Sequence, residues 1–135
     1  MAFGLLQIHS LLRWILLIAG LVALIYGIYG WVTKRPYDRI MRSSASTFAG
    51  LLHLQVVLGF FILVSMRLTL TGLIGHIFLT LGAAVAAQIP LSTMRRRRPE
   101  DRTFLPHALF TALAFLLLWF GMQSINRGLF SSFYI

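Results

Sequence analysis

The chain has 135 residues, of which 59% are hydrophobic and 11% are charged, and its formal net charge is +9. Soluble globular domains carry roughly 25% charged residues. The composition therefore argues against a soluble fold and predicts one integral membrane domain over 1–135. The absence of cysteine excludes disulfides, covalent c-type haem attachment and cysteine-ligated iron–sulfur clusters.

Four apolar runs predict transmembrane helices over 11–32, 45–66, 70–91 and 105–125. Each is close to the roughly 20 residues that cross a bilayer core. Pro36 and its polar neighbours separate the first two helices, and Ser43 or Ser44 is the expected cap of the second. The short turn over 67–69 predicts that the second and third helices form an antiparallel hairpin. Pro106 suits the first turn of the fourth helix. The fold class is therefore all-α, an up-down four-helix membrane bundle.

The basic residues predict how the bundle is oriented. Nine of the twelve Lys and Arg residues lie in the segments 33–43 and 93–103, which also hold all three acids. Basic residues beside membrane spans remain on the cytoplasmic side. We therefore expect a multi-pass protein of the bacterial inner membrane with both loops cytoplasmic and both termini outside. Topology and anionic lipid headgroups explain the positive charge, and no nucleic-acid partner is expected. The start, 1–8, lacks the positive region of a cleaved signal peptide.

Each expected helix carries or adjoins one histidine: His9, His53, His76 and His107. Most of them share a helix face with small residues, which in membranes usually face other helices. Two interpretations remain open. In the first, these faces are packing seams and each imidazole bonds to a neighbouring polar group. In the second, the small residues leave space for a flat macrocycle, and the histidines bind its iron.

The expected order of the helices pairs the histidines. The first and third spans lie diagonally in a sequential bundle and run in the same direction. His9 and His76, on these two spans, both lie toward the outer side. His53 and His107 lie toward the inner side, where His107 is expected to be an interfacial residue. His76 is the expected principal ligand, with His9 or His53 opposite, and Thr80 is expected to bind one ring nitrogen of His76.

Arg13 follows His9 by one helical turn on the same face. Its planar guanidinium suits a haem propionate, since it bonds to carboxylates in a bidentate manner. The alternative is an arginine that extends its charge to the membrane interface.

The spans contain no Asp or Glu. This argues against a proton pump or a cation-coupled transporter, which need such a group at membrane depth. It also rules out a Ser-His-Asp constellation within the spans. A stand-alone enzyme is therefore not expected.

Two motifs carry a resemblance: His9-Ser10-Leu11-Leu12-Arg13-Trp14 and His53-Leu54-Gln55-Val56-Val57-Leu58-Gly59. With them the chain resembles small bacterial four-helix membrane proteins labelled cytochrome b-like. In size and histidine placement it is similar to membrane-anchor and b561-type cytochromes. The resemblance implies haem b between helices, with His9, His53 and His76 as candidate metal ligands. The chain departs from two-haem cytochromes because no helix carries two widely spaced histidines.

The expected function is a small b-type cytochrome-like electron-transfer subunit of a bacterial energy-transducing membrane complex. The alternative is a cofactor-free structural or assembly subunit of a respiratory or photosynthetic complex. Contact with a quinone or a pigment is a third interpretation. In each case the expected partners are the lipid bilayer and larger membrane-protein subunits.

Overall fold

The computed structural model describes residues 2–65 and 73–124. It contains the helices α1 (Ala2–Val32), α2 (Arg39–Ser65), α3 (Ile74–Arg96) and α4 (Leu105–Gln123), and a short 3-10 turn, η1 (Pro99–Asp101). All four long helices have the length and apolar composition needed to cross a membrane. The prediction of an all-α, multi-pass membrane protein is therefore confirmed.

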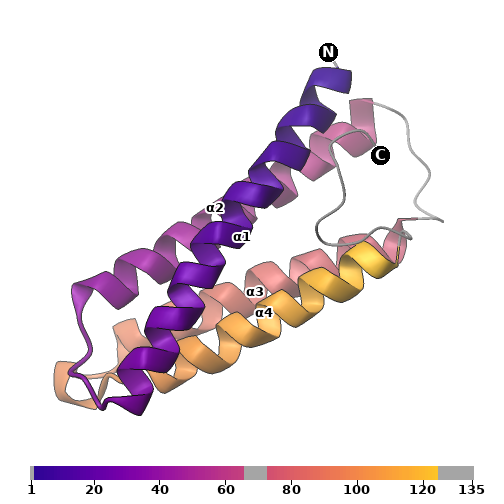
Figure 1. Cartoon of the computed structure of the whole chain (residues 1–135). Helices are drawn as coiled ribbons and strands as arrows, with labels where there is room; N and C mark the ends of the chain where they lie inside the picture. Colours follow the sequence, from indigo (N-terminus) through magenta and orange to yellow (C-terminus); the bar gives the residue numbers. More distant parts are fainter. Residues whose placement is uncertain (1, 66–72, 125–135) are drawn as a thin grey trace.

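The helices form a ring in which α1 packs on α2 and α4, and α3 packs on α4 and α2. This arrangement places α1 and α3 on one diagonal, as the sequence predicted. Figure 1 shows that the α1–α2 pair and the α3–α4 pair meet at the end that carries the 33–38 and 97–104 connections, and diverge toward the N-terminus. We call the first the loop end and the second the terminal end.

Several helix boundaries differ from the predicted ones. The helix α2 begins at Arg39, well before residue 45, because the Asp38 carboxylate caps it by accepting the Met41 backbone N–H at 3.0 Å. The expected cap at Ser43 or Ser44 is wrong, since both lie inside the helix. The predicted boundaries at 66, 70 and 125 lie outside the described residues.

Two other helices are longer than their predicted spans. The helix α1 begins at Ala2 rather than near residue 11, and α3 continues past Pro90 to Arg96. The added end of α3 is polar, and hydropathy does not mark a helix there although its backbone hydrogen bonding continues. The added start of α1 over 2–8 is itself mostly apolar and extends the span. Pro90 is buried within α3. Prolines are tolerated in membrane helices when neighbouring structure satisfies the freed backbone groups.

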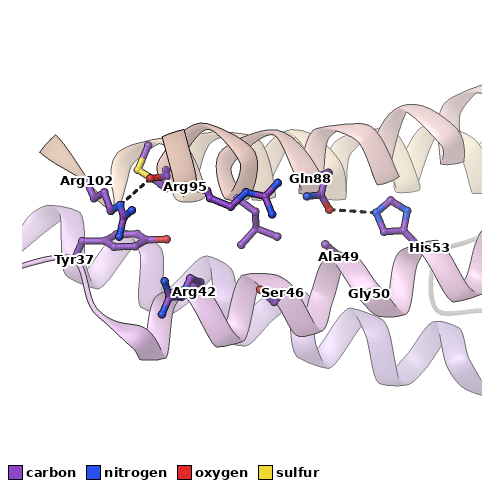
Figure 2. A pocket seen from close by; sticks show the side chains of 11 residues that line it. Tyr37, Arg42, Ser46, Ala49, Gly50, His53, Gln88, Arg95 and Arg102 are labelled. Atoms are coloured by element: carbon purple, nitrogen blue, oxygen red, sulfur yellow. Dashed lines mark hydrogen bonds between the residues drawn. The ribbon is translucent and has the colours of Figure 1, made fainter. Parts of the chain in front are cut away.

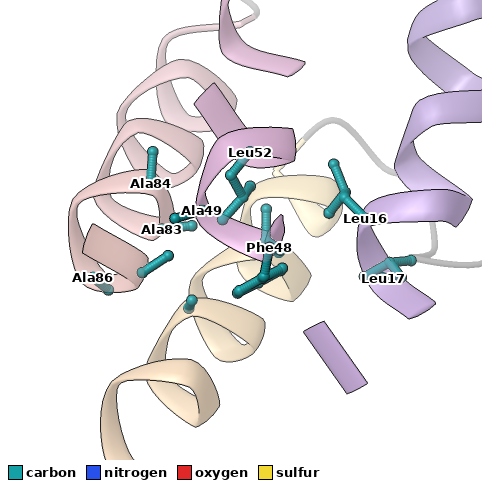
Figure 3. Packing of buried hydrophobic residues seen from close by; sticks show 11 residues of the cluster. Leu16, Leu17, Phe48, Ala49, Leu52, Ala83, Ala84 and Ala86 are labelled. Carbon is teal, nitrogen blue, oxygen red and sulfur yellow. The ribbon is translucent and has the colours of Figure 1, made fainter. Parts of the chain in front are cut away.

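The main core joins large side chains of α1 and α2 to small ones of α3 (Figure 3). Leu16 and Leu17 of α1 and Phe48 and Leu52 of α2 are almost completely buried. The same cluster includes a run of buried alanines of α3, Ala83, Ala84, Ala86 and Ala87. Small residues let helix backbones approach closely, which is the main source of helix association in lipid. Large apolar side chains instead cover the outside, where Ile18, Phe60 and Phe78 are 63%, 60% and 67% exposed.

The glycine face of α1 is a packing seam at the loop end. A Cβ atom at Gly30 would lie 2.3 Å from the Phe104 ring, and one at Gly27 would lie 3.3 Å from the Ala108 backbone nitrogen. Both glycines are therefore needed for close packing against the start of α4 and the residue before it. In this part of α1 the small residues leave no space for a macrocycle.

Candidate functional site

His9 lies near the start of α1 and His76 near the start of α3, so both histidines belong to the terminal end. The charge of His76 acts on His9 across the bundle. The ring of His9 lies over Gly59 of α2, where a Cβ atom would be 3.4 Å from its Cε1. The two histidines therefore lie at the same end of the bundle, on diagonal helices.

The side chain of His76 is oriented by the backbone of α4. Its Nδ1 lies 3.0 Å from the Gly121 carbonyl oxygen. A carbonyl only accepts, so Nδ1 carries the proton and donates, and Nε2 keeps its lone pair. Gly121 permits this approach, since a Cβ atom there would lie 3.3 Å from Thr80 Cγ2 and 3.4 Å from Leu79 Cβ. The close packing of α3 on α4 therefore fixes the tautomer of His76.

Thr80 does not bind the His76 ring, so that expectation is wrong. Its hydroxyl donates to the His76 backbone oxygen at 2.7 Å and to the Ile77 oxygen at 3.1 Å. This is the usual local bond of a threonine within a helix, which needs no second element. The Gly121 carbonyl takes the ring proton instead.

His9 is held through its backbone rather than through its ring. The Gln55 side-chain Nε2 donates to the His9 backbone oxygen at 2.7 Å, which ties α1 to α2. The His9 Nδ1 and Gln55 Oε1 atoms are buried and have no hydrogen-bonding partner among the described residues. A buried polar atom without a partner typically costs about 1–3 kcal/mol.

Arg13 lies beside this histidine pair. Its guanidinium is 5.4 Å from the centroid of the Trp14 ring, within cation–π range, and it interacts electrostatically with His9. Arg13 is partly exposed. The arrangement holds a positive charge at the terminal end of α1, adjacent to the imidazoles.

His53 lies elsewhere, in the groove between α2 and α3. It is exposed, and its Nε2 is 3.4 Å from the Gln88 side-chain oxygen (Figure 2). That distance is longer than an ordinary N–H···O hydrogen bond, so the contact is weak. Gln88, rather than His9 or His76, is the partner that the structure gives to His53.

His107 is fully buried instead of facing the interface. It lies at the loop end, as expected, but its exposed fraction is 0%. Its ring stacks on Tyr37 with centroids 5.5 Å apart, and its Nε2 forms a 2.7 Å hydrogen bond with the Tyr37 hydroxyl. Sequence reasoning missed this partner because Tyr37 belongs to a connection that folds back onto the bundle.

No cluster of three or more metal-binding side chains occurs among the described residues. A haem iron needs only two axial imidazoles, so this finding concerns other metal sites. Over the described residues, the fold defines a multi-pass membrane protein of four helices, and one end of it carries His9 and His76. No family model, no curated protein and no solved structure matches the chain.

Proposed function

We propose that this protein is a small b-type cytochrome-like electron-transfer subunit of a bacterial energy-transducing membrane complex. In this proposal His76 and His9 would hold one haem b between the helices. The observation that carries it is the hydrogen bond from His76 Nδ1 to the Gly121 carbonyl oxygen. That bond leaves Nε2 free to donate its lone pair to a metal, which is the usual state of a ligating histidine.

The chemistry of the donor set fits this cofactor. Histidine is a common axial ligand of haem iron, and a backbone carbonyl on the other ring nitrogen increases its basicity and fixes its orientation. His9 lies nearby with a buried, unpartnered Nδ1. Arg13, beside His9, supplies a cation that suits a propionate carboxylate.

The protein's own residues would then bind and orient the cofactor and exclude water from it. When bound, haem supplies one-electron chemistry. No carboxylic acid lies in the described parts of the spans, since Asp38, Glu100 and Asp101 all lie in the connections at the loop end. The proposal therefore includes electron transfer without a carboxylate relay for protons.

The test is a reduced-minus-oxidised visible spectrum of protein produced with ample haem and its native partners. We expect a b-type band in the wild type, loss of the band in His76→Gly, and its return when imidazole is added to that variant. Imidazole would restore the ligand in the space left by the side chain. Absence of a band from the wild type would overturn the cytochrome proposal.

The second candidate is a cofactor-free structural or assembly subunit. The observation that favours it is the outward aromatic surface, where Phe60, Phe78 and Trp119 are 60%, 67% and 44% exposed. Aromatic side chains of this kind provide contact area for neighbouring membrane subunits as well as for lipid. In mild-detergent native electrophoresis, this candidate requires a stable larger complex from protein that lacks the haem band. A stable monomer would contradict it.

We also propose that the loop end is cytoplasmic. The support is the concentration of basic residues there, including Arg95, Arg96, Arg97 and Arg98. The native chain has no cysteine, so Arg97→Cys gives a single labelling site. We expect a membrane-impermeant thiol reagent to label this site only after the inner membrane is opened. Labelling in intact spheroplasts would show that the loop end faces the outside instead.

A further inference from the structure

A pocket lies between α2 and α3 at the loop end, away from the histidine pair. Its volume is about 290 Å³, and Figure 2 shows the polar side chains around it. They come from α2, from α3 and from the two connections at this end: Tyr37, Arg42, Ser46, His53, Gln88, Arg95 and Arg102. The proposed function uses none of these residues.

The pocket concentrates positive charge that no carboxylate of the described residues neutralises. Arg42, Arg95 and Arg102 line it from three different segments. The acids of the chain are paired elsewhere. Asp38 pairs with Arg35 at 3.4 Å, and Arg98 pairs with Glu100 at 3.4 Å and Asp101 at 3.2 Å. The three pocket arginines therefore favour an anionic ligand.

Part of this charged wall is held in place before any ligand binds. The Arg102 Nε donates to the Met94 backbone oxygen at 2.8 Å and to the Arg97 oxygen at 3.2 Å. Tyr37 is fixed by its stacking and hydrogen bond with His107. Burial raises the pKa of the Tyr37 phenol, while Arg42 and Arg102 act in the opposite direction. Such preorganisation lowers the entropic cost of binding.

The pocket continues from its charged part along an apolar wall. Ala49, Gly50 and Leu91 line this wall between the two helices. A Cβ atom at Gly50 would meet no other atom within 4 Å, so the backbone of α2 is open there. A ligand with an anionic head and an alkyl chain would match the arginine-lined part of the pocket and the apolar wall beside it.

We infer that this pocket binds the phosphate headgroup of an anionic membrane phospholipid. Arginine forks bond to phosphate oxygens in a bidentate manner, and the Ser46 hydroxyl adds a neutral donor. Basic pockets between membrane helices at the interface are suited to such headgroups. The volume is close to the lower end of the roughly 300–1,000 Å³ typical of sites that enclose a whole ligand, which suits a headgroup whose chains remain in the bilayer.

The test compares two double variants of equal charge in the full-length protein. Arg42→Gln with Arg95→Gln removes two pocket arginines, whereas Arg39→Gln with Arg96→Gln removes two exposed arginines from the same ends of α2 and α3 that do not line the pocket. Delipidated protein in neutral detergent is titrated with phosphatidylglycerol or phosphatidylcholine and followed by native mass spectrometry. Circular dichroism establishes that each variant is folded.

We expect the wild type and the exposed-arginine control to bind phosphatidylglycerol with the same affinity and to prefer it to phosphatidylcholine. Loss of two charge-assisted hydrogen bonds should weaken the pocket variant by about thirtyfold or more. Gly50→Leu, which leaves every charge in place, should also weaken binding by filling the apolar part. If the pocket arginine variant does not fold, lipid binding by Gly50→Leu tests the inference instead.

Three results would overturn the inference. The first is equal binding of both lipids by the wild type. The second is unchanged phosphatidylglycerol binding in Gly50→Leu and in a folded pocket variant. The third is displacement of the lipid by inorganic phosphate at comparable concentrations, which would identify a site for soluble anions.

Discussion

The two ends of the bundle both bury histidine, but they surround it differently. At the loop end, His107 stacks on Tyr37 and bonds to its hydroxyl at 2.7 Å. At the terminal end, His76 Nδ1 bonds to a backbone carbonyl oxygen. Both His9 and His107 keep a buried Nδ1 without a hydrogen-bonding partner among the described residues, so the two ends differ in the group that holds the ring. A histidine embedded in aromatic side chains serves packing. A histidine whose tautomer is set by a carbonyl is prepared to ligate.

The surroundings of His107 reinforce this difference. Phe104 is 2% exposed and forms edge contacts with Tyr26 and Tyr37, with ring centroids 5.6 Å and 5.8 Å apart. Met41 and Ala45 of α2 complete the cluster. Aromatic pairs of this geometry contribute about 0.5–1.5 kcal/mol each beyond their buried area. The loop end is therefore the better-packed end, and changes there should act on stability.

The largest expected effect on stability is that of His107→Ala. The substitution removes a completely buried ring together with its stacking and hydrogen bond, so we expect a loss of about 3 kcal/mol in the free energy of unfolding. Reversible unfolding in mixed micelles measures it. Tyr37→Phe, which deletes only the hydroxyl, should cost about 1 kcal/mol. Equal stability of His107→Ala and wild type would remove the distinction between the two ends.

A smaller effect is expected from filling the α1 seam. Gly30→Ala places a methyl group against the Phe104 ring and should destabilise the protein by about 2 kcal/mol through overpacking. Gly50→Ala is the matched control, because its Cβ atom meets nothing within 4 Å. It should leave the melting temperature unchanged or raise it slightly. Similar losses in both variants would show that contact with Phe104 is not the cause at residue 30, since Ala favours a helix more than Gly does.

The smallest effect concerns the cap of α2. Burial acts to raise the pKa of Asp38, but hydrogen bonds from Tyr26, the Met41 backbone and Arg35 together hold it below its usual value. A depressed pKa means that the contribution of Asp38 is complete above the unfolded value of about 3.9 and is lost as the pH falls through the lower folded value.

Two substitutions at this position separate the cap from the charge. Asp38→Ala should cost about 1 kcal/mol at neutral pH. Asp38→Asn should retain most of the cap but lose the acid-dependent part. Unfolding curves between pH 3 and pH 7 measure both. An unchanged acid dependence in Asp38→Asn would assign it to other carboxylates.

Much of the fold was predictable from the sequence because lipid imposes one dominant rule. Four apolar runs and the short turns between them gave the number, type and order of the helices, since a membrane span must satisfy its own backbone. The start of α2 was missed because capping depends on one side chain. The sequence offers Asp38, Ser43 and Ser44 as caps, and only the fold of the preceding connection selects Asp38.

The site was predictable only in part, and for a geometric reason. Helical periodicity placed His9 and His76 on faces with small residues, and the diagonal order of α1 and α3 suggested their approach. The partner of His76 was not predictable, because a backbone carbonyl has no signature in sequence. The sequence showed only Gly121 itself, a small residue that permits the close approach of α4 to α3. His107 and Tyr37 were separated by too many residues to be paired by periodicity.

The most direct test of the account measures cofactor content and thermal stability in His76→Ala and His107→Ala side by side. We expect opposite losses in the two variants. His76→Ala should lose the reduced b-type band while its apoprotein melts like the wild-type apoprotein. His107→Ala should melt earlier but keep the band when it is prepared cold. A full band with an unshifted potential in His76→Ala, or loss of the band in folded His107→Ala, would contradict the assignment of cofactor binding to the terminal end.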